Sequence, residues 1–293
     1  LPEALNALGS IYEKKGEFEE AEKLIMKALE IDKNLVKAKI NLATIYQHFK
    51  KNEDATKIYL DLENDGHLDP NIFFNGANIY LAQGYYKEGW EKHEYRWKVD
   101  PLNKAEWPIE GRQLWEGERD SDIVLWREQG IGDELIFLGL VPEARELSKS
   151  VSVYIDKRLI PLCERSMPDV RFLPDPEQIG EREFDYHLPM GSLPRLFRSS
   201  GEDFEKTVKS YLKADADRVE VLRQELNVGN RKIIGISWKS IKSLNHLKKS
   251  LTLKEFGKIF EDLDIVLLNL QYGEVDEEIK AFERDTGIEI IQC

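Results

Sequence analysis

Residues 1–98 of this chain repeat with a period of 34, and this repeat constrains the fold more strongly than any other feature of the sequence. The clearest column consists of Tyr12, Tyr46 and Tyr80. Four further columns keep the same register without an insertion: Leu8, Leu42 and Gly76; Ala21, Ala55 and Gly89; Gly16 and Gly84; and Phe18 and Tyr86. The repeat predicts three copies of one supersecondary unit, stacked so that each copy covers the apolar face of its neighbour.

Each 34-residue unit is predicted to be a pair of antiparallel helices, which in the first unit cover Ala4–Lys14 and Glu19–Glu30. Small residues such as Gly9 and Ala21 let the two helices approach closely, and Gly16 breaks the chain between them. These columns resemble the tetratricopeptide repeat (TPR) consensus, which implies an α-helical solenoid that binds a peptide or a protein partner. The alternative is a spacer that only holds the next domain.

The second helix of the third unit carries an unusual stripe of large side chains. Trp90, His93, Glu94 and Trp97 follow one another at i, i+3, i+4 and i+7, so they share one face of the helix. A stripe of this kind favours a packing seam over a ligand site. We therefore expect it to dock onto the following domain, with His93 as an interface histidine whose hydrogen bonds are satisfied.

The periodicity changes after the repeats and predicts an α/β region. Residues 99–118 are predicted to be a linker, 119–226 a Rossmann-like lobe with a connecting helix, and 227–293 the first part of a second lobe. Strand–helix alternation of this kind predicts parallel sheets covered by helices. The predicted strands are 122–126, 151–155, 170–173, 232–238, 265–269 and 288–291, and the predicted helices are 134–149 with a kink or restart at Pro142, 159–165, 205–226, 253–263 and 276–285.

Charge and cysteine content exclude several classes of function. The formal net charge is -13, so the surface as a whole repels phosphate backbones, and nucleic-acid binding is not expected. No apolar run reaches the length of about 18 residues that crosses a bilayer. Cys163 and Cys293 are too few for a disulfide framework or a zinc site, so we expect no metal and a reducing, cytoplasmic location.

The two ends of the chain carry an expectation of their own. The chain begins at Leu1, inside a helical pattern and without a visible signal peptide. It ends at Cys293, directly after the strand-like run 288–291. Natural domains rarely end at such a point, which suggests a fragment of a longer protein.

The first candidate site is the segment Glu128-Gln129-Gly130-Ile131-Gly132-Asp133-Glu134, which follows a predicted strand and opens a helix. Glycines there let the backbone approach a ligand, and the free N–H groups of a helix start favour anions. The segment lacks the third glycine of a dinucleotide fingerprint and the Gly-Lys-Ser/Thr of a P-loop. Asp133 is either the cap of the helix or a functional carboxylate, and its spacing does not decide between them.

The second candidate site is a local reversal of charge. Between Arg231 and Lys254 there are seven basic residues and no acidic one. The loop from Lys239 to Lys249 follows a predicted strand, at the edge where open α/β sheets bind ligands. Lysines and hydroxyl groups suit the oxygens of a diphosphate, although a solvated basic loop has the same composition.

The third candidate segment is Asn269–Gly273, which again follows a predicted strand. The amide of Gln271 and the ring of Tyr272 are suited to hold a base or a ribose. The same residues also suit an ordinary turn.

Taken in order, these segments resemble one known arrangement. The motifs that carry the resemblance are 89–97 (Gly-Trp-Glu-x-x-Glu-Tyr-Arg-Trp), 114–117 (Leu-Trp-Glu-Gly), 127–134, 185–189 (Asp-Tyr-His-Leu-Pro), 192–194, 235–240 (Gly-Ile-Ser-Trp-Lys-Ser), 249–251 and 270–273. The series covers nearly the whole chain and resembles bacterial TPR–glycosyltransferase fusions related to the heptosyltransferases and, more distantly, to O-GlcNAc transferase. Some such fusions modify flagellin. The resemblance implies a GT-B fold with an N-terminal lobe for the acceptor and a C-terminal lobe for a nucleotide sugar.

The resemblance also implies roles for individual residues and a metal-independent reaction. Asp133 falls at the position of the general base. The remaining residues fall into an acceptor-side loop, namely Gln129, Gly130, Gly132 and Glu134, and a nucleotide-sugar site, namely Ser237, Lys239, Lys249, Ser250, Gln271 and Tyr272. The related proteins continue beyond the position of Cys293 with about a hundred residues of the nucleotide lobe.

Two functions follow from this reading. The first is a glycosyltransferase that uses its repeats to recruit a protein acceptor. The alternative is a TPR interaction scaffold that carries an inactive transferase-like domain. The two differ at the basic loop, because an active donor site requires Lys239 and Lys249 to face the ligand. A dinucleotide-dependent oxidoreductase is disfavoured, because the third glycine and the ribose-binding acid are missing.

Overall fold

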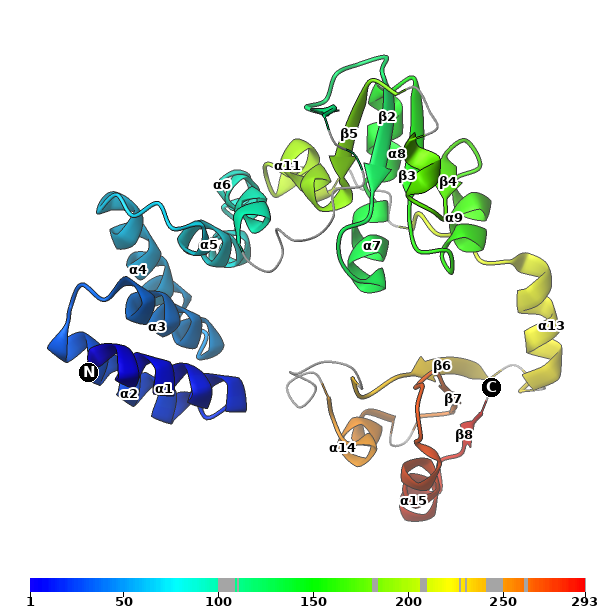
Figure 1. Ribbon diagram of the computed structural model, residues 1–293. Helices are drawn as coiled ribbons and strands as arrows, with labels where there is room; N and C mark the ends of the chain where they lie inside the picture. Colours follow the sequence, from blue (N-terminus) through cyan, green and yellow to red (C-terminus); the bar gives the residue numbers. More distant parts are fainter. Residues whose placement is uncertain are drawn as a thin grey trace. The chain divides into compact units, whose positions relative to one another are not determined.

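The computed structural model describes residues 1–99, 109, 111–180, 184–205, 210–226, 228–229, 231–240, 250–260 and 263–292. The chain divides into two compact units, Leu1–Lys213 and Ala214–Cys293. The first unit holds the helical repeats and a five-stranded parallel sheet, and the second holds a three-stranded parallel sheet (Figure 1).

The repeats form three consecutive helix pairs, coloured blue to cyan in Figure 1. The pairs are α1 (Pro2–Lys15) with α2 (Phe18–Ile31), α3 (Val36–His48) with α4 (Asn52–Asn64), and α5 (Pro70–Ala82) with α6 (Tyr86–His93), followed by the 3-10 helix η1 (Glu94–Lys98). The predicted pairing of helices is confirmed. In the first 34-residue repeat, the predicted helix bounds differ from those of α1 and α2 by about one or two residues at each end.

The small residues of the repeat lie where two helices touch. A Cβ added to Gly9 would lie 2.6 Å from Ile25 Cγ1, and one added to Gly89 would lie 3.1 Å from the backbone nitrogen of Leu81. Gly16 ends α1 with φ +83°, a backbone conformation that favours glycine. The close approach of two helices therefore explains the glycines at positions 9 and 89, and the left-handed backbone conformation at the end of α1 explains Gly16.

The first sheet has the strand order β1-β5-β2-β3-β4, and all its neighbouring pairs are parallel. β2 lies at its centre and is buried along all but its first residue. The strands are β1 (Gln113–Leu114), β2 (Asp122–Trp126), β3 (Ser150–Tyr154), β4 (Arg171–Leu173) and β5 (Tyr186–Pro189). The helices are α7 (Ile131–Leu138), α8 (Val141–Leu147), α9 (Ile160–Ser166), α10 (Glu177–Gly180), η3 (Met190–Ser192), α11 (Leu193–Phe197) and α12 (Glu202–Glu205).

Two of these strands were not predicted. β1 falls inside the predicted linker, and β5 falls in a segment for which no helix or strand was predicted. Both are short, and β5 is stabilised by neighbours distant in the sequence, because it pairs with β2 on one side and β1 on the other. The restart expected at Pro142 is confirmed, since α7 ends at Leu138 and Pro142 lies in the first turn of α8.

The predicted continuous helix over 205–226 is wrong in its first part. Residues 210–215 are not helical, and only α13 (Ala216–Leu226) follows the prediction. The non-helical segment is held against the first unit by three contacts. The Tyr211 hydroxyl donates to the Leu135 carbonyl, and Lys213 exchanges hydrogen bonds with Arg165 and Ser166. These tertiary contacts outweigh the local helical preference.

The second unit has the strand order β6-β7-β8, again with parallel pairs. Its apolar core includes Trp238, Leu267 and Phe282, and Gly257 lies so close to the Phe282 ring that an added Cβ would overlap it. The helix predicted over 253–263 is shorter than expected in its described part. The elements are β6 (Lys232–Ile236), α14 (Leu253–Gly257), the 3-10 helix η5 (Lys258–Phe260), β7 (Ile265–Asn269), α15 (Asp276–Thr286) and β8 (Ile290–Ile291).

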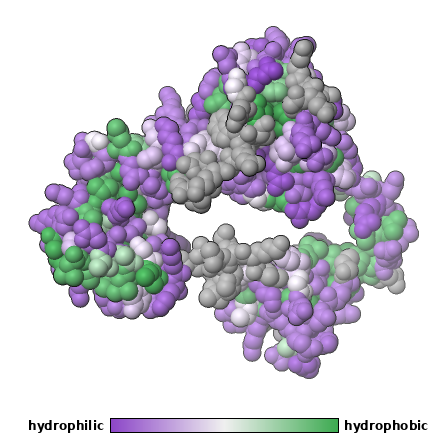
Figure 2. All heavy atoms as spheres, in the orientation of Figure 1, coloured by the Kyte–Doolittle hydropathy of each residue, from purple (hydrophilic) through white to green (hydrophobic). Residues whose placement is uncertain are grey.

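Most of the surface is polar, and apolar patches lie on the helical repeats as well as on other parts of the chain (Figure 2). Exposed large apolar side chains in the first helix pair are Leu8, Ile11, Met26 and Ile31. Within the described ranges, the helices are all too short or too polar to span a membrane.

Candidate functional site

The loop between β2 and α7 holds the first group of predicted residues. It leaves the carboxyl edge of the parallel sheet, the edge at which open α/β sheets bind ligands. Asp133 lies half-buried in the first turn of α7, and its Oδ2 accepts a hydrogen bond from the Gly130 backbone N–H at 3.2 Å. Asp133 therefore caps the helix. Since a carboxylate can accept several hydrogen bonds, this cap is compatible with a further role for Oδ1.

The two glycines of this loop leave open space beside the helix start. A Cβ added to Gly132 would meet no atom of the described residues within 4 Å, and one added to Gly130 would lie 3.6 Å from the Asp133 carboxylate. Neither glycine is among the described residues with positive φ, so backbone strain does not require them. Their missing side chains leave the N-terminal end of α7 accessible to a ligand, and Gln129 beside them is half-buried.

The Glu134 side chain is engaged in contacts within the fold and does not face an acceptor. Its carboxylate is 1% exposed, accepts the backbone N–H of Asp156 at 2.7 Å and forms an ion pair with Arg127 at 3.0 Å. Burial raises the pKa of Glu134, although the Asp156 N–H and the Arg127 charge oppose that rise. Glu134 thus fixes the start of α7 to the segment that follows β3.

Glu128 is the first residue of the candidate segment, but the sequence assigned it no role of its own. Its buried carboxylate receives two hydrogen bonds from Arg96 of η1, Nε to Oε2 at 2.9 Å and Nη2 to Oε1 at 3.1 Å. Burial raises the pKa of Glu128, and the charge and hydrogen bonds of Arg96 act against that rise. Arg96 and Glu128 both lie in motifs named above, but no pattern in the sequence indicates that two residues 32 positions apart form an ion pair.

The aromatic stripe of the third repeat docks onto the first sheet as predicted. The Trp97 ring lies 5.6 Å from the ring of Trp126 in β2, and Trp97 packs against the cluster that includes Ile109 and Phe184. Glu94 also reaches this junction, because its carboxylate accepts hydrogen bonds from Arg96 and Ser192.

His93 differs from its expected state. Its ring packs against Phe74 at 5.8 Å and Trp90 at 5.6 Å. Both ring nitrogens are buried and lack a hydrogen-bond partner among the described residues, so the expectation of satisfied hydrogen bonds is wrong. Burial, with a smaller contribution from the Arg96 charge, lowers the pKa of His93 to about 3.

This pKa predicts an acid sensitivity of the first unit. The folded pKa of about 3 lies below the ordinary value of 6.5, so the unfolded chain binds the proton first as pH falls. His93 should therefore cost about 2 kcal/mol of stability between pH 7 and pH 5. Urea titrations at both pH values should show that His93→Phe removes this loss, whereas His67→Phe, in the loop before α5, retains it. An equal loss in His93→Phe would show that His93 does not cause it.

The second group of predicted residues meets at the carboxyl edge of β6 and β7. Three donors converge on one acceptor, Gln271 Oε1: the Ser237 hydroxyl at 3.0 Å and the backbone N–H groups of Trp238 at 3.0 Å and Lys239 at 2.9 Å. We call these three donors the strand-end cradle. Gln271 is buried, and its own NH₂ group donates to the Tyr272 carbonyl at 3.0 Å. The fold therefore brings Ser237, Lys239 and Gln271 together.

Lys239 is neutralised by a carboxylate of its own unit. Its Nζ lies 2.6 Å from Oε2 of Glu278 in α15, and Glu278 Oε1 accepts from the Trp238 indole at 2.9 Å. Burial alone would raise the pKa of Glu278, but hydrogen bonds from Lys239, Leu253 and Trp238 together hold it below the ordinary value. Glu278 was not singled out from the sequence, because it lies 39 residues after its partner.

The other predicted residues of this group are placed differently. Ser250 Oγ accepts the backbone N–H of Ser240 at 3.0 Å, which joins Ser250 to the segment after the cradle. Tyr272 is 59% exposed. Lys249 lies outside the described residues. Among the residues that the structure does describe, no His, Cys, Asp and Glu side chains cluster as a metal site requires.

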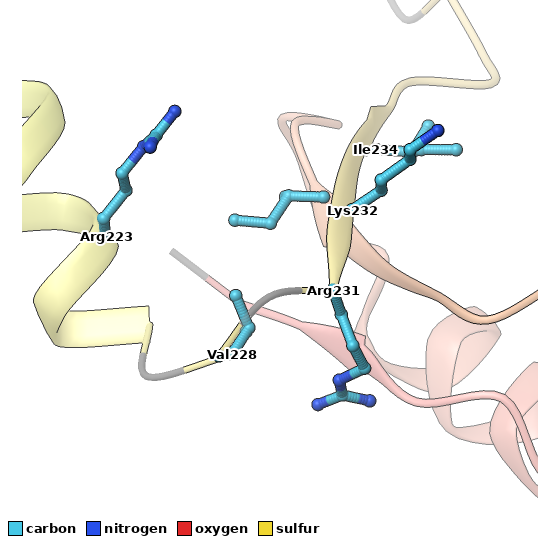
Figure 3. A pocket seen from close by; sticks show the side chains of 7 residues that line it. Arg223, Val228, Arg231, Lys232 and Ile234 are labelled. Carbon is cyan, nitrogen blue, oxygen red and sulfur yellow. The ribbon is translucent and has the colours of Figure 1, made fainter.

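A pocket of about 540 Å³ lies at the opposite end of β6, between that strand and α13. Arg223 of α13 and Arg231 and Lys232 at the start of β6 contribute its cationic side chains (Figure 3). The side chains of Arg223 and Arg231 point in different directions, so they do not converge on one anion (Figure 3). This pocket holds none of the predicted site residues.

The comparisons with known proteins support the repeats. A tetratricopeptide repeat model matches residues 2–35. The first helix pair is a tetratricopeptide repeat. The chain is also 29% identical over 239 residues to Protein FlbA of Caulobacter vibrioides, a match that covers 75% of this chain and 40% of FlbA. The chain thus spans about two-fifths of the length of this relative.

Two solved structures are similar in part. MamA from Desulfovibrio magneticus RS-1 is 18% identical, and the match covers 35% of this chain and 58% of MamA with a TM-score of 0.31. A mutant O-GlcNAc transferase from Thermobaculum terrenum is 12% identical, and the match covers 99% of this chain and 74% of that one with a TM-score of 0.32.

Proposed function

We propose that this protein is a glycosyltransferase that moves a sugar from a nucleotide-sugar donor to a hydroxyl group of a protein acceptor. The observation that carries the proposal is the strand-end cradle, in which Ser237 and the N–H groups of Trp238 and Lys239 converge on a single oxygen. A phosphate oxygen would accept the same three hydrogen bonds and, being charged, would accept them more strongly than the Gln271 amide does. The cradle is therefore suited to the diphosphate of a nucleotide sugar.

Transfer would proceed by direct displacement at the anomeric carbon. The acceptor oxygen forms a bond to that carbon while the bond from the carbon to the diphosphate oxygen breaks, and the diphosphate keeps the electron pair. Asp133 would take the proton of the acceptor hydroxyl, since its Oδ1 is not engaged in the helix cap. The cradle and Lys239 would stabilise the negative charge that grows on the leaving group.

The repeats would supply the acceptor. A stack of tetratricopeptide repeats is a surface for a peptide or a protein partner, and here it is packed against the sheet that carries Asp133. The acceptor would therefore be recruited by the same compact unit that holds the general base.

Removing the predicted cations should weaken nucleotide binding. Each of Lys239→Ala and Lys249→Ala is expected to reduce affinity for the nucleoside diphosphate by about 1.5–3 kcal/mol, because each removes a charge-assisted hydrogen bond. Calorimetric titration measures the change. Lys280→Ala is the matched control, since it removes the same charge from an exposed ion pair with Glu277 in the same unit. Equal losses in all three variants would indicate a general charge effect and refute the phosphate assignment.

A scaffold with an inactive transferase-like domain is the second candidate, and the Lys239–Glu278 ion pair favours it. That pair neutralises the lysine, and the Gln271 amide fills the cradle. Nucleoside diphosphate release from a panel of nucleotide sugars separates the two candidates. Release that depends on added acceptor protein supports the transferase, whereas binding of a protein partner without any release supports the scaffold.

A further inference from the structure

The guanidinium of Arg96 is the most completely engaged charged group at the junction between the repeats and the first sheet. It is 1% exposed, and all three of its nitrogens donate hydrogen bonds. Two bonds go to Glu128, one goes to Glu94 at 2.8 Å, one goes to the Ser192 hydroxyl at 2.8 Å, and one goes to the His93 carbonyl at 3.4 Å. Such a planar, bidentate pair fixes the position of its partner carboxylate as well as its charge.

The Glu128 carboxylate also lies against the backbone of η3. A Cβ added to Gly191 would overlap the Glu128 carboxylate and would lie 3.4 Å from Arg96 Nη2. A side chain at position 191 would therefore have to displace the Glu128 carboxylate. The place of Glu128 is therefore determined jointly by Arg96 and by the closely packed Gly191.

A second anchor holds the same loop at the neighbouring residue. Arg127 forms ion pairs with Glu134 at 3.0 Å and with Asp156 at 3.2 Å, and its backbone N–H donates to the Tyr154 carbonyl. The Glu134 anchor lies within α7 itself, whereas the Arg96 anchor comes from the third repeat. Between and beside these anchors lie Gln129 and Gly130 of the predicted acceptor-side loop and Asp133, the predicted general base.

We propose that Arg96 is a positioning residue that sets the geometry of the Gln129–Asp133 loop through Glu128. The third repeat is then a structural part of the acceptor site and not only a tether for it. Displacing Glu128 should release the loop while the sheet beneath it stays folded. The catalytic consequence rests on the proposed function, but the effect on the loop does not.

Hydrogen–deuterium exchange of the full-length protein tests the effect on the loop without requiring activity. Arg96→Met and Gly191→Ala, which both displace the Glu128 carboxylate, should speed exchange at residues 129–134 by about tenfold or more through local opening, while β3, whose protection falls only with the global stability, still exchanges more slowly than the loop. Gly76→Ala is the matched control, because its Cβ would make only ordinary contact with Tyr59, at 3.6 Å or more. Unchanged exchange of the loop in both variants would overturn the proposal, whatever the activity of the protein.

A double variant separates positioning from simple stabilisation. Arg96→Met with Glu128→Met removes both buried charges and should regain much of the stability lost by Arg96→Met alone. If Arg96 positions the loop, exchange at residues 129–134 stays fast in this double variant. In addition, its kcat stays at least about tenfold below that of the unmodified protein, while KM for the nucleotide sugar is little changed. Recovery of both loop protection and kcat together with stability would show a merely structural role. Failure to detect transfer in the unmodified protein would refute the proposed function and leave the exchange result standing.

Discussion

Replacing Arg96 by methionine is expected to lower the free energy of unfolding of the first unit by about 3–5 kcal/mol. The substitution leaves the Glu128 carboxylate, 3% exposed, without its counter-charge and without two of its hydrogen bonds. A buried carboxylate in that state is costly, since desolvation is no longer offset by an ion pair. Urea unfolding at neutral pH measures the loss. Part of it should be recovered at lower pH, where Glu128 can become neutral by protonation.

The matched control for this prediction is Arg158→Met. Arg158 also forms an ion pair, with Asp156 at 2.9 Å, but its side chain is 69% exposed. Exposed pairs contribute about 1 kcal/mol or less, so this variant should unfold close to the unmodified protein. Equal destabilisation by the two substitutions would contradict the view that the Arg96–Glu128 pair is a buried junction between repeats and sheet.

Replacing Asp133 by asparagine is expected to reduce transfer by about 100-fold or more while leaving the fold intact. The amide cannot take a proton from the acceptor hydroxyl, but its oxygen can still accept the hydrogen bond from the Gly130 N–H that caps α7. The loss should therefore appear in kcat, with little change in thermal stability or in the affinity for the nucleotide sugar.

Asp69→Asn provides the corresponding control in the repeats. Asp69 caps α5 by accepting the Asn71 N–H at 2.9 Å, so the substitution makes the same chemical change at another helix start. This variant should transfer sugar at the unmodified rate. Unchanged turnover in Asp133→Asn would refute the role of Asp133 as general base and leave it as a helix cap.

Local patterns in the sequence were sufficient for the regular parts of the fold. The 34-residue period predicted the helix pairs, because small residues must recur wherever two helices approach as closely as they do at Gly9 and Ile25. Short apolar runs predicted β2 and β7, because a local run of such residues is itself a strand signal. β5 was missed because it has only four residues, and pairing with β1 and β2 rather than its own composition makes it a strand.

The candidate site was predictable only at its strand ends. The rule that ligands meet parallel sheets at their carboxyl edges brought attention to Lys239, whereas Asp133 was found in a glycine loop at a helix start and Ser237 through the family resemblance. This rule could not reveal the ion pairs of Glu128 and Glu278, because the partners of these carboxylates lie 32 and 39 residues away. Long-range ion pairs of this kind are fixed by packing of whole elements and leave no local periodic signal.

The most direct test of the central claim is a titration of the full-length protein with UDP, GDP, ADP and CMP and their sugars, followed by thermal unfolding. We predict that one nucleotide stabilises the protein by about 2.7 kcal/mol at 100 times its Kd. We further predict that Ser237→Ala, which removes one donor of the strand-end cradle, weakens this stabilisation at the same concentration. Two results would contradict the assignment of the cradle as a nucleotide-sugar site. Either none of the nucleotides stabilises the protein, or one of them stabilises the Ser237→Ala variant as much as the unmodified protein.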